Sequence, residues 1–280
     1  MKYDSQKAAV KLKKEFDRIR YTAYFMIGLV ICVILVSALR KFWLTLIIIA
    51  ATVFIQLFVF RKMQKDYVNH AVEENIRATI GQLLHTDQVV MKGKELMSED
   101  VIRDAALVPV MDKSGAINLF TGVAGYVGKD SKKMKVTSCD VTIAHHQEGT
   151  RISAEILCGN WIHIALPEKT NYHFTVKDGQ FRSLEQENEK EDVGDILDKE
   201  AANGTGMPER FYRQLEKLED YTTGILSMRA DGDMVDVFLK DRFLAANFSA
   251  RGEVTKQMID WNPMPELEKV LYLEIGRAHV

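Results

Sequence analysis

The sequence predicts an α+β protein in which an N-terminal transmembrane helical hairpin precedes a cytosolic domain of antiparallel β-hairpins with packed helices. Two observations support this fold class. Residues 21–39 and 42–60 form two apolar runs of 19 residues, and neither run contains Asp, Glu, Lys, Arg or His. Later segments alternate apolar and polar residues with the period of two that is typical of strands, and pairs of these segments flank turns that contain glycine.

The two apolar runs are long enough to cross a bilayer. At about 1.5 Å per residue, a helix of this length covers roughly 28 Å, which is close to the hydrocarbon thickness. Arg40 and Lys41 alone separate the runs, so a tight turn must join two antiparallel helices. A signal peptide has a shorter apolar region that ends in small residues, and core helices of soluble proteins keep a polar stripe. Neither alternative matches these runs, and we therefore predict two spans.

Basic residues on either side of the runs predict their orientation. Residues 1–20 contain seven basic and three acidic residues, and Arg61, Lys62 and Lys65 follow the second run. The turn contains two basic residues, so the positive-inside rule places both termini in the cytoplasm and the turn outside. Apolar residues at helical spacing in residues 1–20 further predict a surface helix whose lysines contact anionic lipid headgroups.

Charge and cysteine content narrow the classes of partner. The chain has a net charge of −2; the first 20 residues contribute +4 and the turn +2, which leaves −8 for residues 61–280. An acidic cytosolic part argues against a nucleic-acid partner, because phosphates require basic surfaces. Three cysteines are too few for a disulfide framework, and the cytosol keeps thiols reduced.

The cytosolic part divides into a helix with a connector, residues 61–97, and an α+β domain, residues 98–274. The helix carries an apolar stripe that predicts packing on its own protein or, alternatively, a coiled-coil seam. In the α+β domain we predict a short helix with Ser98 as its N-cap and Pro109 at its end, and an extended segment at 116–127 with bulge glycines. An acidic loop at 185–206, a helix from Pro208 and a last helix from near Pro265 follow.

The final six residues have a different origin in our interpretation. Residues 275–280 match a translation of a common sequencing-adapter read-through, ATC GGA AGA GCA CAC GTC. We therefore expect the native C-terminus to differ, and we exclude these residues from fold reasoning.

Three β-hairpins follow from alternation and turn residues. In the first, residues 137–145 and 151–158 flank Glu148-Gly149, which would place Cys139 directly opposite Cys158 on an apolar face. In the second, residues 172–176 and 180–184 flank Asp178-Gly179. In the third, Asp231-Gly232 forms the turn, so that Met228 would oppose Val235.

Reactive side-chain types gather in the first hairpin: Cys139, Asp140, His145, His146, Cys158 and His163. A zinc site requires about four converging ligands, and the weak candidates that share a face are Cys139, Cys158 and His145. Paired cysteines in a cytosolic sheet are more often small buried apolar residues. We therefore predict reduced, buried thiols, and we assign no catalytic residue, no cofactor-binding residue and no cofactor.

Three stretches carry a resemblance: TGVAGYVGK, KVTSCDVTIAH and ISAEILCGNWIHIALP, in which residues 125–128, 137–141 and 159–161 match. They resemble an uncharacterised bacterial family of membrane-anchored proteins, a domain of unknown function with an N-terminal transmembrane pair and a cytosolic α+β domain. The resemblance covers most of residues 63–274. It implies a bacterial inner (plasma) membrane location and no catalytic residues.

Two functions remain open from the sequence. The first, which we favour, is a membrane-anchored interaction or sensing module that presents a binding face to an unknown protein partner. The alternative is a membrane-tethered enzyme, metal-assisted, that uses the Cys and His cluster of residues 137–163.

Overall fold

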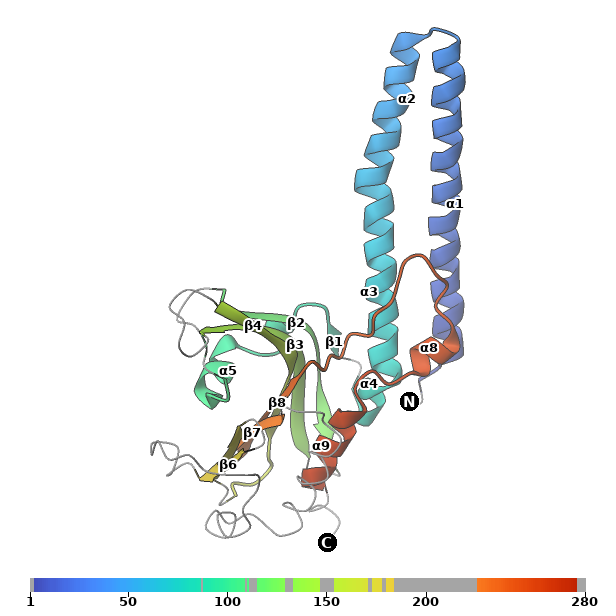
Figure 1. The fold of residues 1–280 in the computed structure, drawn as a ribbon. Coiled ribbons are helices and arrows are strands. Elements are labelled where there is room, and N and C mark those ends of the chain that lie inside the picture. Colours follow the sequence, from blue (N-terminus) through green and yellow to red (C-terminus); the bar gives the residue numbers. More distant parts are fainter. Residues whose placement is uncertain are drawn as a thin grey trace. The chain divides into compact units, whose positions relative to one another are not determined.

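The computed structural model describes residues 3–275 except 87, 109, 111–114, 129–132, 147–153, 171–172, 178–179 and 184–225. The chain folds into two compact units (Figure 1). The helical unit comprises Met1–Ala78 and Ala246–Trp261, and the sheet unit comprises Thr79–Ala245 and Asn262–Val280. The predicted acidic loop, the helix from Pro208, two of the hairpin turns and residues 276–280 lie outside the described residues.

The helical unit begins with α1, Ser5–Ala38, whose N-cap Asp4 accepts a hydrogen bond from the backbone N–H of Lys7. After a turn, α2 (Phe42–Phe54), the π-helix η1 (Ile55–Phe60) and α3 (Arg61–Ala78) follow one another without a break. Among the described residues, two helices are thus long and apolar enough to cross a membrane, and no residue in the most apolar window of either helix is buried. The second apolar helix continues directly into the predicted cytosolic helix.

The segment Ala246–Trp261, which contains α8 (Lys256–Asp260), completes the helical unit. The buried Tyr67 hydroxyl donates a hydrogen bond to the carbonyl oxygen of Gly252 at 3.0 Å and accepts one from the N–H of Val254 at 2.9 Å. The Asn75 amide donates to three carbonyls at the end of this segment, those of Met258, Ile259 and Trp261. The stripe of α3 therefore packs on its own protein, as expected.

Residues 1–20 differ from the predicted surface helix. Residues 5–20 form the first half of α1, and Ala8, Leu12 and Ile19 are buried. Polar contacts link this half of α1 to α3: Tyr3 and Lys11 contact Glu74, and the Glu15 carboxylate lies 2.9 Å from Nδ1 of His70. The apolar residues do have helical spacing, but they pack against other helices of the protein instead of lying on a membrane surface.

The sheet unit contains an antiparallel sheet of eight described strands in the order β1-β2-β3-β4-β8-β7-β5-β6. Its strands are β1 (Val89–Val90), β2 (Ile117–Val127), β3 (Met134–His146), β4 (Ala154–Ala165), β5 (His173–Lys177), β6 (Gln180–Ser183), β7 (Leu226–Asp231) and β8 (Met234–Lys240). Its helices are α4 (Ile80–Leu83), the 3₁₀ turn η2 (Gly93–Glu95), α5 (Glu99–Ala105) and α9 (Pro265–Ile275). The predicted α+β class is confirmed.

The local signals at α5, β2 and α9 gave mixed results. Ser98 caps α5 through the N–H of Asp100, as predicted, but the helix ends at Ala105, before Pro109. The β2–β3 register shifts between Leu119 and Gly122, which is the predicted glycine bulge. Helix α9 begins at Pro265, and its apolar residues Leu267, Val270 and Leu271 are buried.

The predicted register of the first hairpin is wrong. Cys139 pairs with Trp161, and Cys158 pairs with Thr142. Residue numbers of opposed positions sum to 300 instead of 297, and an odd shift moves every side chain of one strand to the other face. As a result, Leu157 packs in the core, whereas Ile156 is 65 % exposed. This register is centred on residue 150, so it is not compatible with a two-residue turn at Glu148-Gly149.

The third hairpin has the predicted faces but a shifted register. Met228 pairs with Val237, and Ala230 pairs with Val235. The turn is Gly232-Asp233, in which Gly232 has a φ of +64°. A shift of two residues preserves the faces, so Met228, Val235 and Val237 are all buried, as predicted.

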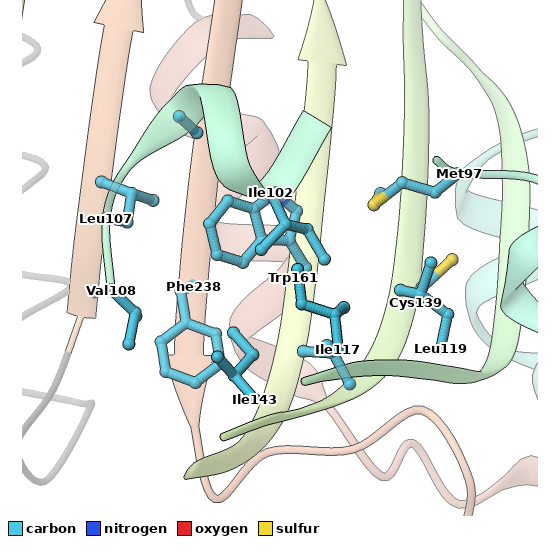
Figure 2. Close-up of a cluster of buried hydrophobic side chains, with 12 residues drawn as sticks. Met97, Ile102, Leu107, Val108, Ile117, Leu119, Cys139, Ile143, Trp161 and Phe238 are labelled. Atoms are coloured by element: carbon cyan, nitrogen blue, oxygen red, sulfur yellow. The ribbon is translucent and has the colours of Figure 1, made fainter. Parts of the chain in front are cut away.

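One face of the sheet holds a large apolar cluster (Figure 2). Trp161 and Phe238 lie at its centre with ring centroids 5.9 Å apart, and Ile102 of α5 packs against them. The other face of the same strands is also apolar, since Val136, Ile162, Ile164 and Val237 are buried there. The central strands are therefore covered on both sides.

Candidate functional site

On the face of the sheet that α5 covers, an apolar row of residues is followed directly by a polar row. The pairing of β3, β4 and β8 aligns Cys139, Trp161 and Phe238 in one row. The next row along the strands consists of polar residues: Thr137, His163, Asp236, Arg229 and Thr175. This polar row is the candidate functional site. It brings together residues of five strands, from Thr137 on β3 to Asp236 on β8.

Asp236 lies at the centre of the polar row and is 7 % exposed. Its Oδ1 accepts a hydrogen bond from the indole N–H of Trp161 at 2.9 Å and lies 2.9 Å from Nδ1 of His163. One carboxylate oxygen thus fixes both rings. Because Nδ1 faces this carboxylate, Nε2 is the ring nitrogen of His163 that Asp236 does not engage. A carboxylate-oriented imidazole of this kind can accept or donate a proton, or bind a ligand, through Nε2.

Arg229 follows Asp236 in the polar row. Its Nη1 donates to the carbonyl oxygens of Asp104 and Ala105 at the C-terminus of α5, at 3.3 and 3.4 Å. Its Nη2 pairs with Asp231 at 3.2 Å, and Asp231 also contacts Nδ1 of His173. A cation at a helix C-terminus is favourable for the helix dipole. Arg229 therefore holds α5 over the sheet through Nη1, and Nη2 is engaged by Asp231.

A second polar network lies on the opposite face of β3 and β4. Asp140 is 4 % exposed and accepts hydrogen bonds from the Asn160 amide, the N–H of Leu244 and the N–H of Ala245, at 2.9, 2.7 and 3.1 Å. The Ser138 hydroxyl donates to the Asn160 side-chain oxygen at 2.6 Å. Burial raises the pKa of Asp140 to about 6, although the hydrogen bonds from Leu244, Asn160 and Ala245 oppose the shift. This network satisfies the backbone where the chain leaves β8, so its role is structural.

The predicted reactive residues are spread over both faces. Cys139 is buried in the apolar cluster, and its Sγ lies 3.9 Å from the carbonyl oxygen of Gly93. Cys158 is half-buried on the opposite face. Burial, and secondarily the Asp140 carboxylate, raises the pKa of the Cys139 thiol to about 12, which makes it a poor nucleophile.

The metal candidates can be placed in part. The observed register separates Cys139 from Cys158, which contradicts the predicted opposition of the two thiols. His145 and His146 lie near the end of β3, opposite Glu155 and Ala154. Among the described residues, no group of three or more His, Cys, Asp and Glu side chains is arranged to hold a metal ion.

The sequence pattern places His163 in the reactive cluster but does not identify its partner Asp236. Asp236 lies on β8, and only the long-range pairing of β4 with β8 brings it to His163. A signal did exist, because Asp236 stands between Val235 and Val237 in an otherwise apolar strand, as His163 stands between Ile162 and Ile164. Because Phe238 and Trp161, the next residues on the same faces, are large and apolar, these faces are buried as well, and a titratable residue there requires a partner.

Comparison with known proteins adds no constraint. No protein-family model, no curated protein and no solved structure matches the chain. The bacterial family that the sequence resembles therefore stays a prediction, and any function must be argued from the chain itself.

Proposed function

We propose that the protein is a membrane-anchored interaction or sensing module of a bacterial inner membrane, with both termini and the sheet unit in the cytoplasm. The observation that supports this best is the path of the chain. It passes between the helical unit and the sheet unit three times, after Ala78, after Ala245 and after Trp261. An anchor that only retains an enzyme at the membrane needs one connection. Three connections favour a role in which a change in the helical unit is passed to the sheet unit.

Hydrogen exchange of the full chain in lipid nanodiscs tests this coupling. Tyr67→Phe removes two hydrogen bonds inside the helical unit without touching the sheet unit. Coupling predicts faster exchange in β7 and β8 as well as in residues 252–259. A surface change in the same unit, Lys256→Ala, serves as the control. If Tyr67→Phe alters only the helical unit, the connections are passive and the sensing role is wrong.

The orientation rests on the basic residues that flank the spans. A reporter that works only in the cytoplasm should be active when it is fused to the N-terminus or inserted after Lys62. Protease added to intact spheroplasts should leave the sheet unit uncut. Digestion of the sheet unit from outside would overturn the proposed orientation.

For the lipid contact we propose fewer residues than the whole basic tail. Because α1 is continuous, Lys7 lies about 21 Å along the helix axis from the first apolar run, well beyond a Debye length of about 8 Å. Lys11 and Lys13 pair with Glu74 and Glu253. We therefore assign the contact with anionic headgroups to the exposed residues closest to the spans: Arg18, Arg20, Arg61, Lys62 and Lys65.

A second candidate function is proton transfer at His163. The supporting observation is its contact with the buried Asp236, a pairing that orients a general acid or base. Asp236→Asn would keep the volume but remove the charge that orients His163. An activity of the purified protein that falls at least tenfold in both His163→Gln and Asp236→Asn would favour the enzyme. An activity unaffected by both changes would exclude this site.

A further inference from the structure

Gln56 is the one carboxamide side chain in the two proposed membrane spans, and no hydrogen bond from the described residues compensates it. The three threonines of the apolar runs bond their own helices: Thr22 donates to the carbonyl oxygen of Arg18, Thr45 to that of Lys41 and Thr52 to that of Ile48. The side chain of Gln56 is exposed and makes no hydrogen bond within the part of the chain that the structure describes. In lipid, its amide would face hydrocarbon with two donors and an acceptor unsatisfied.

The depth of Gln56 does not allow its amide to escape to water easily. The residue lies four positions before Phe60, about 6 Å inside the nearer end of the apolar run. Helical side chains lean towards the N-terminus of their helix. For Gln56, that direction leads away from the nearer interface and towards the bilayer centre.

The backbone around Gln56 is also unusual. Residues Ile55–Phe60 form a π-helix, and the carbonyl oxygen of Gln56 accepts the wide-turn hydrogen bond from the N–H of Arg61. Such π segments are rare and occur frequently at functional sites. On the other side of this turn, Phe54 and Phe58 pack ring against ring with centroids 5.0 Å apart. The π-helix thus presents an aromatic side and an amide side.

We infer that Gln56 is the contact point of a homodimer within the membrane, in which the Gln56 amides of two copies of this chain bond each other. A carboxamide is both donor and acceptor, so two copies related by a two-fold axis satisfy one another. All copies insert with the same orientation, and Gln56 therefore meets Gln56 at the same depth. An unrelated partner would need a matching polar group at that depth, whereas a second copy has one necessarily. The inference rests on the proposed membrane insertion.

Energy transfer between donor-labelled and acceptor-labelled full chains in phosphatidylcholine–phosphatidylglycerol vesicles tests the dimer. Gln56→Leu keeps the approximate size of the side chain and removes the amide. It should lower the dimerisation constant about three- to thirtyfold, the range that corresponds to about 0.6–2 kcal/mol for interhelical polar contacts. Gln56→Asn should retain part of the association. Thr52→Val, one turn away, removes a hydroxyl that bonds its own helix and should change nothing.

Disulfide cross-linking in native membranes locates the contact. The background carries Cys32→Ala and Cys158→Ala and keeps the buried Cys139. Val53→Cys, one turn before Gln56 on the same side of the helix, keeps the amide and should give a cross-linked dimer, whereas Phe58→Cys, on the aromatic side, should not. Equal cross-linking at both positions, or unchanged association of Gln56→Leu, would overturn the inference. Alkaline carbonate extraction of the same membranes distinguishes failure of the dimer from failure of membrane insertion. Release of the chain would overturn both the proposed spans and the dimer, whereas retention of the chain would leave the spans intact and overturn only the contact at Gln56.

Discussion

The buried carboxyl of Asp140 predicts a specific pH dependence of stability. Its pKa is raised from 3.8 to about 6 in the folded chain, mainly because burial disfavours the charged form. A raised carboxyl pKa means that the folded state holds its proton more tightly than the unfolded state. The contribution of Asp140 to stability is therefore greatest below pH 3.8 and is lost as the pH rises through about 6.

The size of this effect follows from the shift. A difference of about 2.2 pKa units corresponds to about 3 kcal/mol of stability in full, and about 2 kcal/mol of it should be lost between pH 4.5 and pH 7.5. Asp140→Asn cannot ionise, so the variant should lack this part of the pH dependence. It should also lose about 1–3 kcal/mol at every pH, because an amide N–H would face the N–H of Ala245 in place of an acceptor.

Urea unfolding of the full chain in detergent micelles, at pH 4.5 and 7.5, measures both effects. The fluorescence of the buried Trp161 reports the sheet unit when Trp43 and Trp261 are replaced by Phe. The quantity to compare is the change in unfolding free energy between the two pH values, in the parent and in Asp140→Asn. The two changes should differ by about 2 kcal/mol. Parallel pH profiles would refute the assignment of a destabilising buried carboxylate to this position.

Three further experiments test other parts of the structure. Val237→Asp introduces an unpaired charge at a fully buried position and should cost several kcal/mol in a urea titration. Gly159→Ala should weaken the pairing of β4 with β8, because a Cβ there would lie 2.3 Å from the carbonyl oxygen of Leu239. The matched control is Gly252→Ala, where a Cβ would meet nothing within 4 Å. Equal melting temperatures of the two variants would contradict the close packing at Gly159. Maleimide should label Cys158 in the folded chain but not Cys139, whose thiol is buried and has its pKa raised to about 12; rapid labelling of both would show that the apolar cluster is open.

Local signals in the sequence predicted local structure well. The apolar runs, the Ser98 cap, the bulge near Gly122 and the start of α9 at Pro265 each depend on a few neighbouring residues. The role of residues 1–20 was missed for a different reason. An amphipathic helix has the same spacing whether its apolar face meets a membrane or another helix, and the partner of α1 includes a segment some 240 positions later in the chain.

Which residues make up the candidate site depends on the register of β3 against β4, and the sequence does not predict this register. A two-residue turn at Glu148-Gly149 would have placed Cys158 beside Cys139 and given the chain a pair of thiols. The observed register, three positions away, places Trp161 beside Cys139 and His163 beside Thr137. Because the shift is odd, it turns the other face of β4 towards Cys139. Cys158 therefore leaves this face, and His163 takes a place on it beside the carboxylate of Asp236 on β8. The side chains on this face therefore depend on the register of β3 against β4 and on the pairing of β8 with β4. Neither can be deduced from the alternation of residues within the hairpin.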